Sequence, residues 1–354
     1  GWELNAYTSK FARFGKFSMK LRGNIAQNFN EVEEMDPLIL EALNGAETYQ
    51  PGNLAYNNRV QIGNALGSIY GLRYKGVYRY DYDHNGYTTA SISSYGYAEV
   101  NNTGYDAQGN PINTAAAAQR RHENFTCPIA YDADGNMLTD AKGIPLPMYY
   151  CYNESYRKQF QGGDAIYEDV NHDGQIDRYD MVYLGNSNPK CNGGFGFTLF
   201  YGRFSLNTGF NFRMGNKIIN LARANYESMR SNTNQSYATT WRWRKNGDET
   251  VIPRALTNVN GYESYNSLPS DRYVENGNYL RLQYVQLRYE FNPQKLKKYG
   301  IRQLTLSASA NNVWCWSKYT GVDPDVSPQG FSVSTDNSRT PRTKSFTCSA
   351  NLSF

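Results

Sequence analysis

Histidine, long apolar runs and net charge are the features that this sequence has least of. Its three histidines, His84, His122 and His172, are scattered over 354 residues. None accompanies a nucleophile motif, so no catalytic triad is indicated. No run approaches 18 apolar residues, which excludes a transmembrane helix. The net charge of +4 is small and spread along the chain, so a nucleic-acid partner is not indicated.

Cysteine is also scarce, and the five cysteines show no metal-ligand spacing. Their odd number leaves at least one unpaired. Cys127 and Cys151 fall in one predicted loop and could form a disulfide, whereas Cys348 falls on the apolar face of a predicted strand. The sequence does not begin with Met and shows no charged and apolar leader. We therefore interpret it as a processed product or a piece of a longer protein.

Aromatic residues, by contrast, are abundant, with 31 Tyr, 16 Phe and 5 Trp. The segment Gly194–Arg213 reads GFGFTLFYGRFSLNTGFNFR, and apolar and polar residues alternate on both sides of Gly202-Arg203. A period of two predicts two strands with one apolar face each, joined as a hairpin by the glycine turn. Each arm is long enough to cross a bilayer when tilted. A soluble β-sandwich gives the same local pattern, and Tyr-rich strands suit either a membrane girdle or a carbohydrate-contacting surface.

The same alternation recurs elsewhere in the chain. Further strands are predicted at Trp2–Phe11, Phe17–Ile25, Tyr279–Phe291, Leu304–Ala310 and Phe346–Phe354. Together with the hairpin they make about seven antiparallel strands. The apolar parity of one strand shifts after Leu282, which predicts a β-bulge near Gln283-Tyr284.

Connection lengths decide between a soluble sandwich and a membrane barrel. Short turns at 12–15, 202–203 and 292–302 alternate with long polar connections. In outer-membrane barrels the extracellular loops are long and the periplasmic turns short, whereas sandwiches show no such alternation. We therefore predict an all-β fold, a segment of a large transmembrane β-barrel with long extracellular loops. A polar lumen face also explains the mean hydropathy of −0.70.

The expected organisation has three parts: a strand hairpin at 1–29, an extracellular loop region at 30–193, and the last five strands with their loops at 194–354. Within the loop region, Asp106–Asn110 and Asp132–Asn136 are predicted to be tips of small hairpins. About seven strands leave two open edges, which lipid does not tolerate because unpaired backbone groups are costly there. The chain must therefore pair with strands outside this sequence, on the same polypeptide or on another.

Several segments together resemble one family. They are Gly67–Tyr78 (GSIYGLRYKGVY), Glu168–Gly185 (EDVNHDGQIDRYDMVYLG), Asn188–Gly194, Arg242–Asp248, Ile252-Pro253-Arg254, Asn278–Leu287 (NYLRLQYVQL), Asn311–Val326 (NNVWCWSKYTGVDPDV) and the terminal Phe strand. In this order they are similar to the C-terminal part of a SusC/RagA-type TonB-linked outer-membrane transporter of Bacteroidetes. The family's TonB-binding segment, its plug and the first part of its barrel have no counterpart in this sequence.

The resemblance implies a protein of the cell outer membrane that imports oligosaccharides or peptides. It further implies a SusD-like surface lipoprotein above the outer loops, and energy delivered by TonB through the missing plug. The carboxylate pair Asp323 and Asp325 could suggest a glycosidase, but it lies in a family-like segment and is interpreted as loop structure. We predict that the chain is not an enzyme. Two alternatives are a structural or secretion-associated barrel without import, and a soluble calcium-binding β adhesin.

Calcium is the predicted cofactor, in the segment 169–180. This segment matches an EF-hand loop at positions one, three, five, six, nine and twelve, with Asp in place of the usual Glu at the last. Hard oxygens would converge from Asp169, Asn171, Asp173, the Gln175 carbonyl, Asp177 and Asp180. No convincing helices flank the loop, so the ion would be a structural staple. The alternative is an ion-free turn in which the Asx side chains cap backbone groups.

Two further features concern the outer loops and the last strand. The motif Trp241-Arg-Trp-Arg could stack on sugars or peptides, or anchor its loop by cation–π contacts; the resemblance favours the anchor. No substrate-binding residues can be singled out. The apolar residues of the last strand should face lipid, with Phe354 at the periplasmic interface. The resemblance implies that Phe354 is read by the barrel-insertion machinery.

Overall fold

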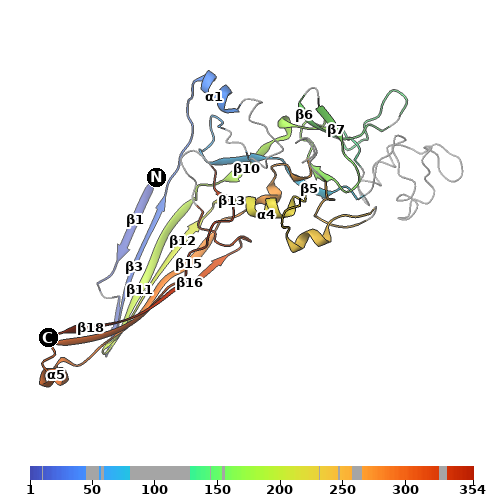
Figure 1. Ribbon diagram of the computed structural model, residues 1–354. Coiled ribbons are helices and arrows are strands. Elements are labelled where there is room, and N and C mark those ends of the chain that lie inside the picture. Colours follow the sequence, from blue (N-terminus) through green and yellow to red (C-terminus); the bar gives the residue numbers. More distant parts are fainter. Residues whose placement is uncertain are drawn as a thin grey trace.

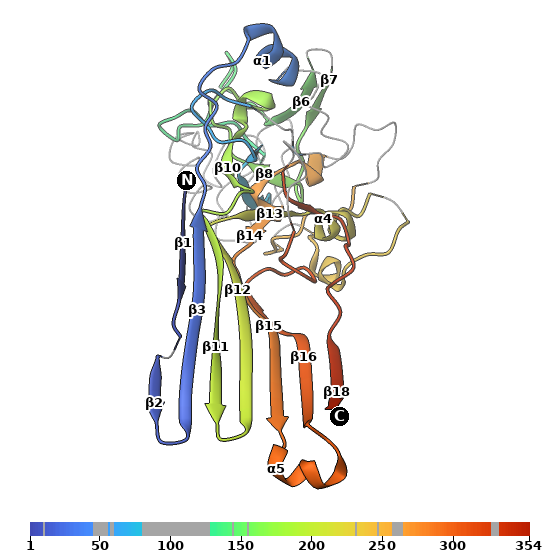
Figure 2. The same cartoon turned by 90° about the vertical axis from the view of Figure 1, so that its left-hand side faces the viewer.

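A computed structural model describes residues 1–9, 11–44, 56, 60–79, 128–143, 145–153, 156–230, 232–245, 248–256, 265–326 and 333–354. The chain has two parts (Figure 1). Long strands lie side by side in one wall, and shorter strands and helices gather in an outer part at one end of that wall. The short connections lie at the opposite end (Figure 2).

The strands are β1 (Trp2–Tyr7), β2 (Ala12–Phe14), β3 (Phe17–Gln27), β4 (Ser68–Gly71), β5 (Tyr74–Val77), β6 (Tyr149–Asn153), β7 (Tyr156–Gln159), β8 (Ala165–Tyr167), β9 (Gln175–Ile176), β10 (Val182–Asn186), β11 (Cys191–Tyr201), β12 (Phe204–Met214), β13 (Lys217–Asn220), β14 (Val274–Asn276), β15 (Tyr279–Glu290), β16 (Gln303–Ser317), β17 (Thr335–Asp336) and β18 (Ser345–Ser353). The helices are α1 (Pro37–Asn44), α4 (Leu221–Glu227) and α5 (Pro293–Leu296), with 3₁₀ turns η3 (Arg178–Asp180), η4 (Tyr237–Trp241), η5 (Tyr265–Ser267), η6 (Asp271–Tyr273) and η7 (Lys297–Tyr299). No helix in the described part of the chain is long and apolar enough to span a membrane.

The wall is an antiparallel sheet in the order β1-β3-β11-β12-β15-β16-β18, with β2 also paired to β3. Its seven positions confirm the predicted strand set and its pairing. One boundary was wrong: residues 12–14, expected to be part of a turn, form β2 and pair with Phe17–Met19. The turn is therefore the two residues Gly15 and Lys16, where Gly15 has a φ of +57° that glycine adopts without steric cost.

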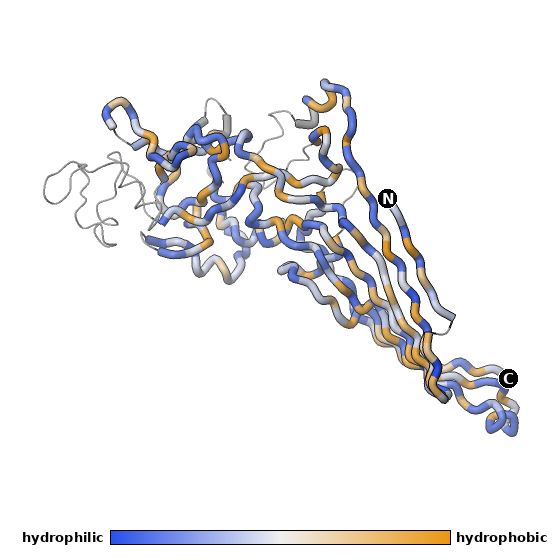
Figure 3. The backbone as a smooth tube through the Cα atoms, turned by 180° about the vertical axis from the view of Figure 1, so that it is seen from behind, coloured by the Kyte–Doolittle hydropathy of each residue, from blue (hydrophilic) through white to orange (hydrophobic). Residues whose placement is uncertain are grey.

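Apolar and polar residues alternate along the strands of the wall (Figure 3), which gives each strand an apolar and a polar face, as predicted. Register places Phe195 beside Phe210 and Leu199 beside Leu206 on one face. On the other face, Gly194 lies beside Asn24, and Thr198 beside Lys20. We call these the apolar face and the polar face. Aromatic rings stack on the apolar face, with Phe195 and Phe210 centroids 4.8 Å apart.

The predicted β-bulge is confirmed. The pairing of β15 with both neighbours shifts register between Leu282 and Tyr284. Gln283 is thus an extra residue, which lets Leu280 and Leu282 share the apolar face with Val285 and Leu287. On β16 the irregularity is taken up near Asn312, which has a φ of +53°, a conformation that Asn tolerates better than most residues.

The last strand pairs on one side only. Residues Ser345–Ser353 run antiparallel to Asn311–Gln303, which confirms the predicted neighbour. At the other end of the sheet order lies β1, and β18 does not pair with it in the described structure. The chain is therefore an open arc of a β-barrel and not a small closed barrel.

The buried core lies in the outer part. Its largest cluster combines Tyr70, Leu72, Tyr78, Ala130, Met148, Tyr150, Phe160, Ala165, Tyr167, Ile176, Met181, Tyr265 and Leu268. By contrast every residue of the edge strand β18 is exposed, because within the described structure it has a neighbouring strand on one side only. The outer part thus holds itself together in the way of a soluble domain, whereas the wall does not.

Two predictions about the loops fall partly outside the described residues. The turn Asp132–Asn136 closes a small hairpin, because Tyr131 bridges Met137 and Asp132 Oδ1 accepts from the Asn136 amide at 2.8 Å. The similar segment 106–110 lies outside the described residues. So does Cys127, but its suggested partner Cys151 is a free, buried thiol that donates to Gln175 Oε1 at 3.0 Å. The disulfide is therefore not supported.

Candidate functional site: the polar face and the loops above it

The polar face of the wall bears a cleft of about 880 Å³. Residues of β1, β3, β11, β12 and β15 line it, together with two residues of the loop between β16 and β18. They are Asn5, Ala6, Tyr7, Arg22, Gly23, Asn24, Asn192, Gly193, Gly194, Phe195, Gly209, Phe210, Asn211, Phe212, Arg213, Tyr279, Gln283, Tyr284, Asp325 and Arg342. Amides, guanidinium groups and tyrosine rings therefore dominate a surface that can donate and accept hydrogen bonds and stack on flat groups.

The floor of this cleft is shaped by glycine. The Tyr284 ring lies flat over Gly209, so a Cβ at that position would come within 2.4 Å of the ring. The Arg22 guanidinium lies 5.7 Å from the centre of the same ring, in cation–π range. A Cβ on neighbouring Gly196 would come within 2.3 Å of the Thr208 carbonyl oxygen. The glycines therefore let Tyr284 and Arg22 lie close to the wall.

Above the cleft, a loop is fastened to the wall by two arginines, and a third arginine within the same connection adds an internal ion pair. Arg281 of β15 pairs with Asp323 at 2.5 Å. Asp325 is 3.5 Å from Arg213 of β12 and 2.5 Å from Arg342. The side chains of Arg213, Arg281 and both aspartates are largely buried, so these pairs are better shielded from solvent than surface ion pairs.

This arrangement agrees with the interpretation of Asp323 and Asp325 as loop structure. Burial raises the pKa of Asp323, but hydrogen bonds from the Asp325 amide and from Arg281 lower it more, and the result lies below the usual value. A carboxylate held ionised by arginine is poorly suited to act as a general acid, which needs a raised pKa.

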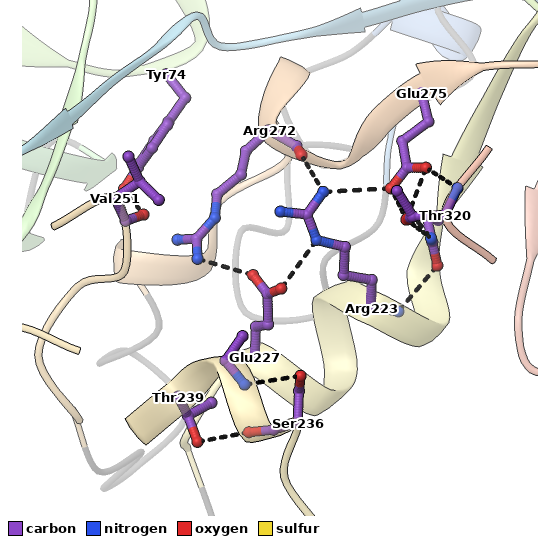
Figure 4. A network of polar contacts seen from close by, with 11 residues as sticks. Tyr74, Arg223, Glu227, Ser236, Thr239, Val251, Arg272, Glu275 and Thr320 are labelled. Carbon is purple, nitrogen blue, oxygen red and sulfur yellow. Dashed lines mark hydrogen bonds and ion pairs between the residues drawn. The ribbon is translucent and has the colours of Figure 1, made fainter. Parts of the chain in front are cut away.

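A second charged network ties the outer part together (Figure 4). Glu227 at the end of α4 accepts from Arg223 Nε and from Arg272, both at 2.8 Å. Arg223 also reaches Glu275 at 3.2 Å, and Glu275 accepts from the Thr320 amide at 2.8 Å. The network therefore joins two distant parts of the connection between β12 and β15, and ties both to the connection that follows β16.

Buried Asp164 is the centre of a third polar cluster. Its carboxylate accepts from Arg254 Nε at 2.7 Å and from Asn266 Nδ2 at 3.0 Å. Burial raises the pKa of Asp164, and these donors partly reverse that effect. Arg254 lies in the Ile252-Pro253-Arg254 segment that carried part of the family resemblance, so the segment has a structural role here.

The predicted calcium loop is compact, and its carboxylates are engaged by backbone amides. Asp169 accepts from the Gly174 amide at 2.8 Å, and Asp173 from the Gln175 amide at 2.8 Å. Asp180 accepts from Val170 and Asp177, also at 2.8 Å. Gly174, expected to allow the sharp turn, has a φ of +79°.

The remaining predicted ligands lie in the same loop. Asn171 Nδ2 donates to Asp173 at 3.0 Å, and Asp177 caps η3 by accepting from the Tyr179 amide at 2.7 Å. No group of three or more acidic, His or Cys side chains within the described residues is arranged to hold a metal ion. The carboxylates would have to turn from the amides toward an ion, so calcium binding by this loop stays a prediction.

The loop nevertheless concentrates negative charge in a partly buried place. Burial raises the pKa of Asp169 and Asp177 above the ordinary value, and raises that of Asp180 to about 6. Hydrogen bonds from backbone amides oppose each shift. A bound cation would offset the cost of holding these charges together.

We expect added Ca²⁺ to slow hydrogen exchange over residues 169–180 in the EDTA-treated full-length protein that carries this chain. The substitution Asp173→Ala should abolish this protection and loosen the loop while leaving barrel insertion intact. The matched control is Asp132→Ala, which removes a similar turn carboxylate from another loop and should leave the calcium response unchanged. Identical exchange in calcium and in EDTA would leave only the ion-free turn.

The Trp241 motif anchors its loop, but not by the expected contact. Trp243 donates from Nε1 to the Arg79 carbonyl at 3.2 Å and packs its ring against Gly163. No cation–π contact involving either tryptophan occurs among the described residues. Trp241 itself is 69% exposed, so only the second tryptophan holds the loop.

The most elaborate features of the polar face escaped the sequence analysis. Arg213, Arg281 and Arg342 appeared as isolated basic residues, and their aspartate partners lie far away in sequence. The usable signal was the alternation itself, which places Arg213 and Arg281 on the polar face of neighbouring strands, where Arg281 pairs with Asn211 and Arg213 with Tyr279. A charged residue at such a position in a buried setting needs a partner.

Comparisons with known proteins agree with this architecture. No family model matches the chain. TonB-dependent receptor P39 of Formosa agariphila is 28% identical over the whole of this chain, which covers 30% of that receptor. TonB-dependent receptor P26 of the same organism is 31% identical over 48% of this chain and 17% of its own length. The chain thus spans less than a third of the curated relatives it matches.

Solved structures show the same fold. A structure of the RagAB peptide transporter covers 99% of this chain with a TM-score of 0.59 and 17% identity, and the match takes up 28% of that chain. The RagAB peptide importer in its "closed-closed" state gives a TM-score of 0.53 and 15% identity over the same share of this chain. The open arc of amphipathic strands, the full-length similarity to one TonB-dependent receptor and the fold shared with RagAB together make the chain similar to part of the β-barrel of a SusC/RagA-type TonB-dependent receptor.

Proposed function

We propose that this chain forms part of the wall of an outer-membrane TonB-dependent transporter that imports oligosaccharides or peptides. The observation that carries the proposal is the arc of seven strand positions, whose apolar face suits lipid and whose polar face bears the cleft. A homologue named TonB-dependent receptor P39, matched along the whole chain, supports the class of transporter. The likeness to a peptide transporter supports peptides as one of the two substrate classes.

The polar face suits either substrate class. Asparagines and arginines along the cleft can bind peptide carbonyls and carboxylates or sugar hydroxyls, and tyrosine rings can stack on sugar faces or on peptide planes. Arg22 and Tyr284, which lie together over the glycines of the cleft, offer a hydrogen-bond donor and a stacking ring in one place.

The arrangement in the membrane follows from the two ends of the wall. We place the outer part, including the loop region 30–193, outside the cell, and the short turns in the periplasm. Strands outside this sequence complete the barrel and enclose a plug through which TonB delivers energy. A SusD-like lipoprotein covers the outer part. The role of Phe354, which follows β18 and is 71% exposed, as an insertion signal stays a prediction.

We test the proposal by narrowing the cleft without disturbing the sheet. Asn24→Trp places a large ring on the polar face of β3, where Asn24 lines the cleft. Ile25→Trp places the same ring one residue later on the apolar face. We expect energy-coupled uptake of labelled peptides or oligosaccharides to fall about tenfold or more with Asn24→Trp, because a misplaced or blocked substrate loses most of its binding geometry. Uptake should stay near the native level with Ile25→Trp.

Cells that lack TonB provide the second arm of the test. Uptake that depends on TonB and on the polar-face residue supports import. Normal growth on every peptide and oligosaccharide after deletion of the gene, with unchanged amounts of other outer-membrane proteins, would contradict it. A deletion that leaves uptake intact but alters secretion or envelope structure would favour the scaffold, and detergent-free solubility of the full-length protein would favour the adhesin.

A further inference from the structure

The end of the wall opposite the outer part carries an unusual concentration of positive charge. We call this end the turn rim and define it as residues 12–17, 200–205 and 290–303. Its basic residues are Arg13, Lys16, Arg203, Lys295, Lys297, Lys298 and Arg302, and its one acidic residue is Glu290. All seven basic residues are exposed. No ion pair joins any of them to a carboxylate within the described residues.

The turn rim is one continuous surface. The Gly202 amide donates to the Lys16 carbonyl at 3.2 Å, which joins the first two turns. The Glu290 amide donates to the Arg203 carbonyl at 3.0 Å, and the Arg302 amide donates to the Ser353 carbonyl at 2.7 Å. Figure 2 shows the three turns along the same edge of the wall. The cations therefore form a row along this edge.

The charge of the turn rim differs from that of the rest of the chain. The whole sequence has 36 basic and 32 acidic residues. Seven of the basic and one of the acidic residues lie in the rim, which gives it six net positive charges. The remaining 29 basic and 31 acidic residues carry two net negative charges. Glu290 is the one carboxylate of the rim, and it accepts from the neutral amide of Gln303 at 3.1 Å.

Exposed aromatic rings border the turn rim on the apolar face. Tyr201 is 64% exposed and Phe204 49% exposed, and the Phe204 and Tyr289 ring centroids are 4.6 Å apart. Rings of this kind mark the level of the lipid head groups in a bilayer. At the other end of the strand wall, Trp314 and Trp316 form a second exposed pair. The cations of the turn rim thus lie at the level of these rings and just beyond it, at the depth of lipid phosphates.

We propose that the turn rim binds the phosphate groups of anionic phospholipids in the leaflet at this end of the barrel. The proposal rests on the membrane placement given above. Lysine and arginine at this depth keep their aliphatic stems along the apolar surface while their charged groups meet phosphate. The helical turn α5–η7 is suited to this, because Leu296 and Ile301 are partly buried while Lys295, Lys297 and Lys298 are exposed.

Lipid fits these observations better than an acidic protein does. The cations follow the edge of the wall over three separate turns instead of forming one compact patch, and the aromatic border runs beside them. A surface of lipid phosphates is extended in the same way, whereas a protein partner would meet a limited area.

The test compares the full-length transporter that carries this chain with two variants of equal charge change. The rim variant combines Lys295→Gln, Lys297→Gln, Lys298→Gln and Arg302→Gln. The control variant combines Lys142→Gln, Arg157→Gln, Lys245→Gln and Lys318→Gln, which are exposed residues of the outer part and the strand end next to it. Each protein is reconstituted in nanodiscs of phosphatidylcholine with or without phosphatidylglycerol. Native mass spectrometry measures which lipid stays bound, and heat-modified mobility on gels confirms the folded barrel.

We expect native protein and control variant to retain phosphatidylglycerol over phosphatidylcholine, and the rim variant to lose at least about tenfold of that preference. One lysine or arginine near an anionic surface contributes about fivefold, and salt should weaken the effect because it screens exposed charges. Equal preference in the rim and control variants would overturn the proposal. Binding of free inorganic phosphate to the rim without a preference for phosphatidylglycerol would also overturn it. So would loss of a copurifying acidic protein from the rim variant with no change in the bound lipid. If the barrel still shows heat-modified mobility and still transports substrate in these cases, only the lipid proposal fails and the proposed transport function stands.

Discussion

Replacing Ala308 with arginine should destabilise the barrel more than any other single change on the wall. Ala308 lies on the apolar face, paired with Leu287 on one side and Cys348 on the other. It lies between Leu304 and Trp314 on the same strand, which puts it near the middle of the apolar band. An arginine facing lipid at the bilayer midplane costs about 2–4 kcal/mol. The free energy of unfolding of the full-length barrel in lipid vesicles, measured by urea titration, should fall by about that amount.

The neighbouring residue gives the matched control. Ser309 lies on the polar face, paired with Gln286 and Thr347, so Ser309→Arg should change the unfolding free energy by less than about 1 kcal/mol. Equal losses for the two variants would mean that the apolar face does not meet lipid. A larger loss for Ser309→Arg would invert the assignment of the two faces.

Removing Glu227 should open the outer part of the chain. Its carboxylate holds Arg272, whose side chain is only 6% exposed, and also holds Arg223. Breaking one partner out of a buried ion pair costs about 3–5 kcal/mol, because the other charge stays buried without compensation. Glu227→Ala should therefore raise hydrogen exchange over α4 and η6 by a factor of about 100 or more. The strands of the wall should keep their protection.

Glu249→Ala serves as its comparison. Glu249 pairs with Arg79, but its side chain is 76% exposed, and exposed pairs contribute less than about 1 kcal/mol. Exchange should therefore change little. If Glu227→Ala behaved like Glu249→Ala, the charged network would not be what holds the connections of the outer part together.

Local pattern was sufficient to predict the wall. Alternation located β11 and β12, and it revealed the bulge at Gln283 because one inserted residue reverses the face of every residue after it. The boundary at residues 12–14 was wrong because Ala12 and Phe14 fit a turn or a short strand equally well. Only pairing with Phe17–Met19 decides between the two.

The polar networks could not be predicted, because their partners are brought together by the fold. Arg281 and Asp323 are 42 residues apart in sequence, as the residue numbers of their 2.5 Å contact show. Arg272 and Glu227 are 45 apart. No spacing rule connects such pairs, since each depends on how a long connection folds back. Arg281 on β15 meets the connection after β16, and Glu227 and Arg272 come from distant parts of the connection between β12 and β15. For the segment 169–180 the difficulty is different. Its residue types match the spacing of an EF-hand loop, but this spacing does not determine whether the side-chain oxygens bind an ion or accept from backbone amides.

The small sheets of the outer part have a consequence for the order of folding. The hairpin β11–β12 joins residues that are neighbours along the chain. In contrast β4 pairs with β10, and β13 pairs with β17, across more than one hundred residues in each case. Contacts of high contact order form slowly, because the chain entropy of closing long loops is lost before the contacts stabilise it. The wall can therefore grow hairpin by hairpin, while the outer part closes only after β17, close to the last strand, has become available for pairing.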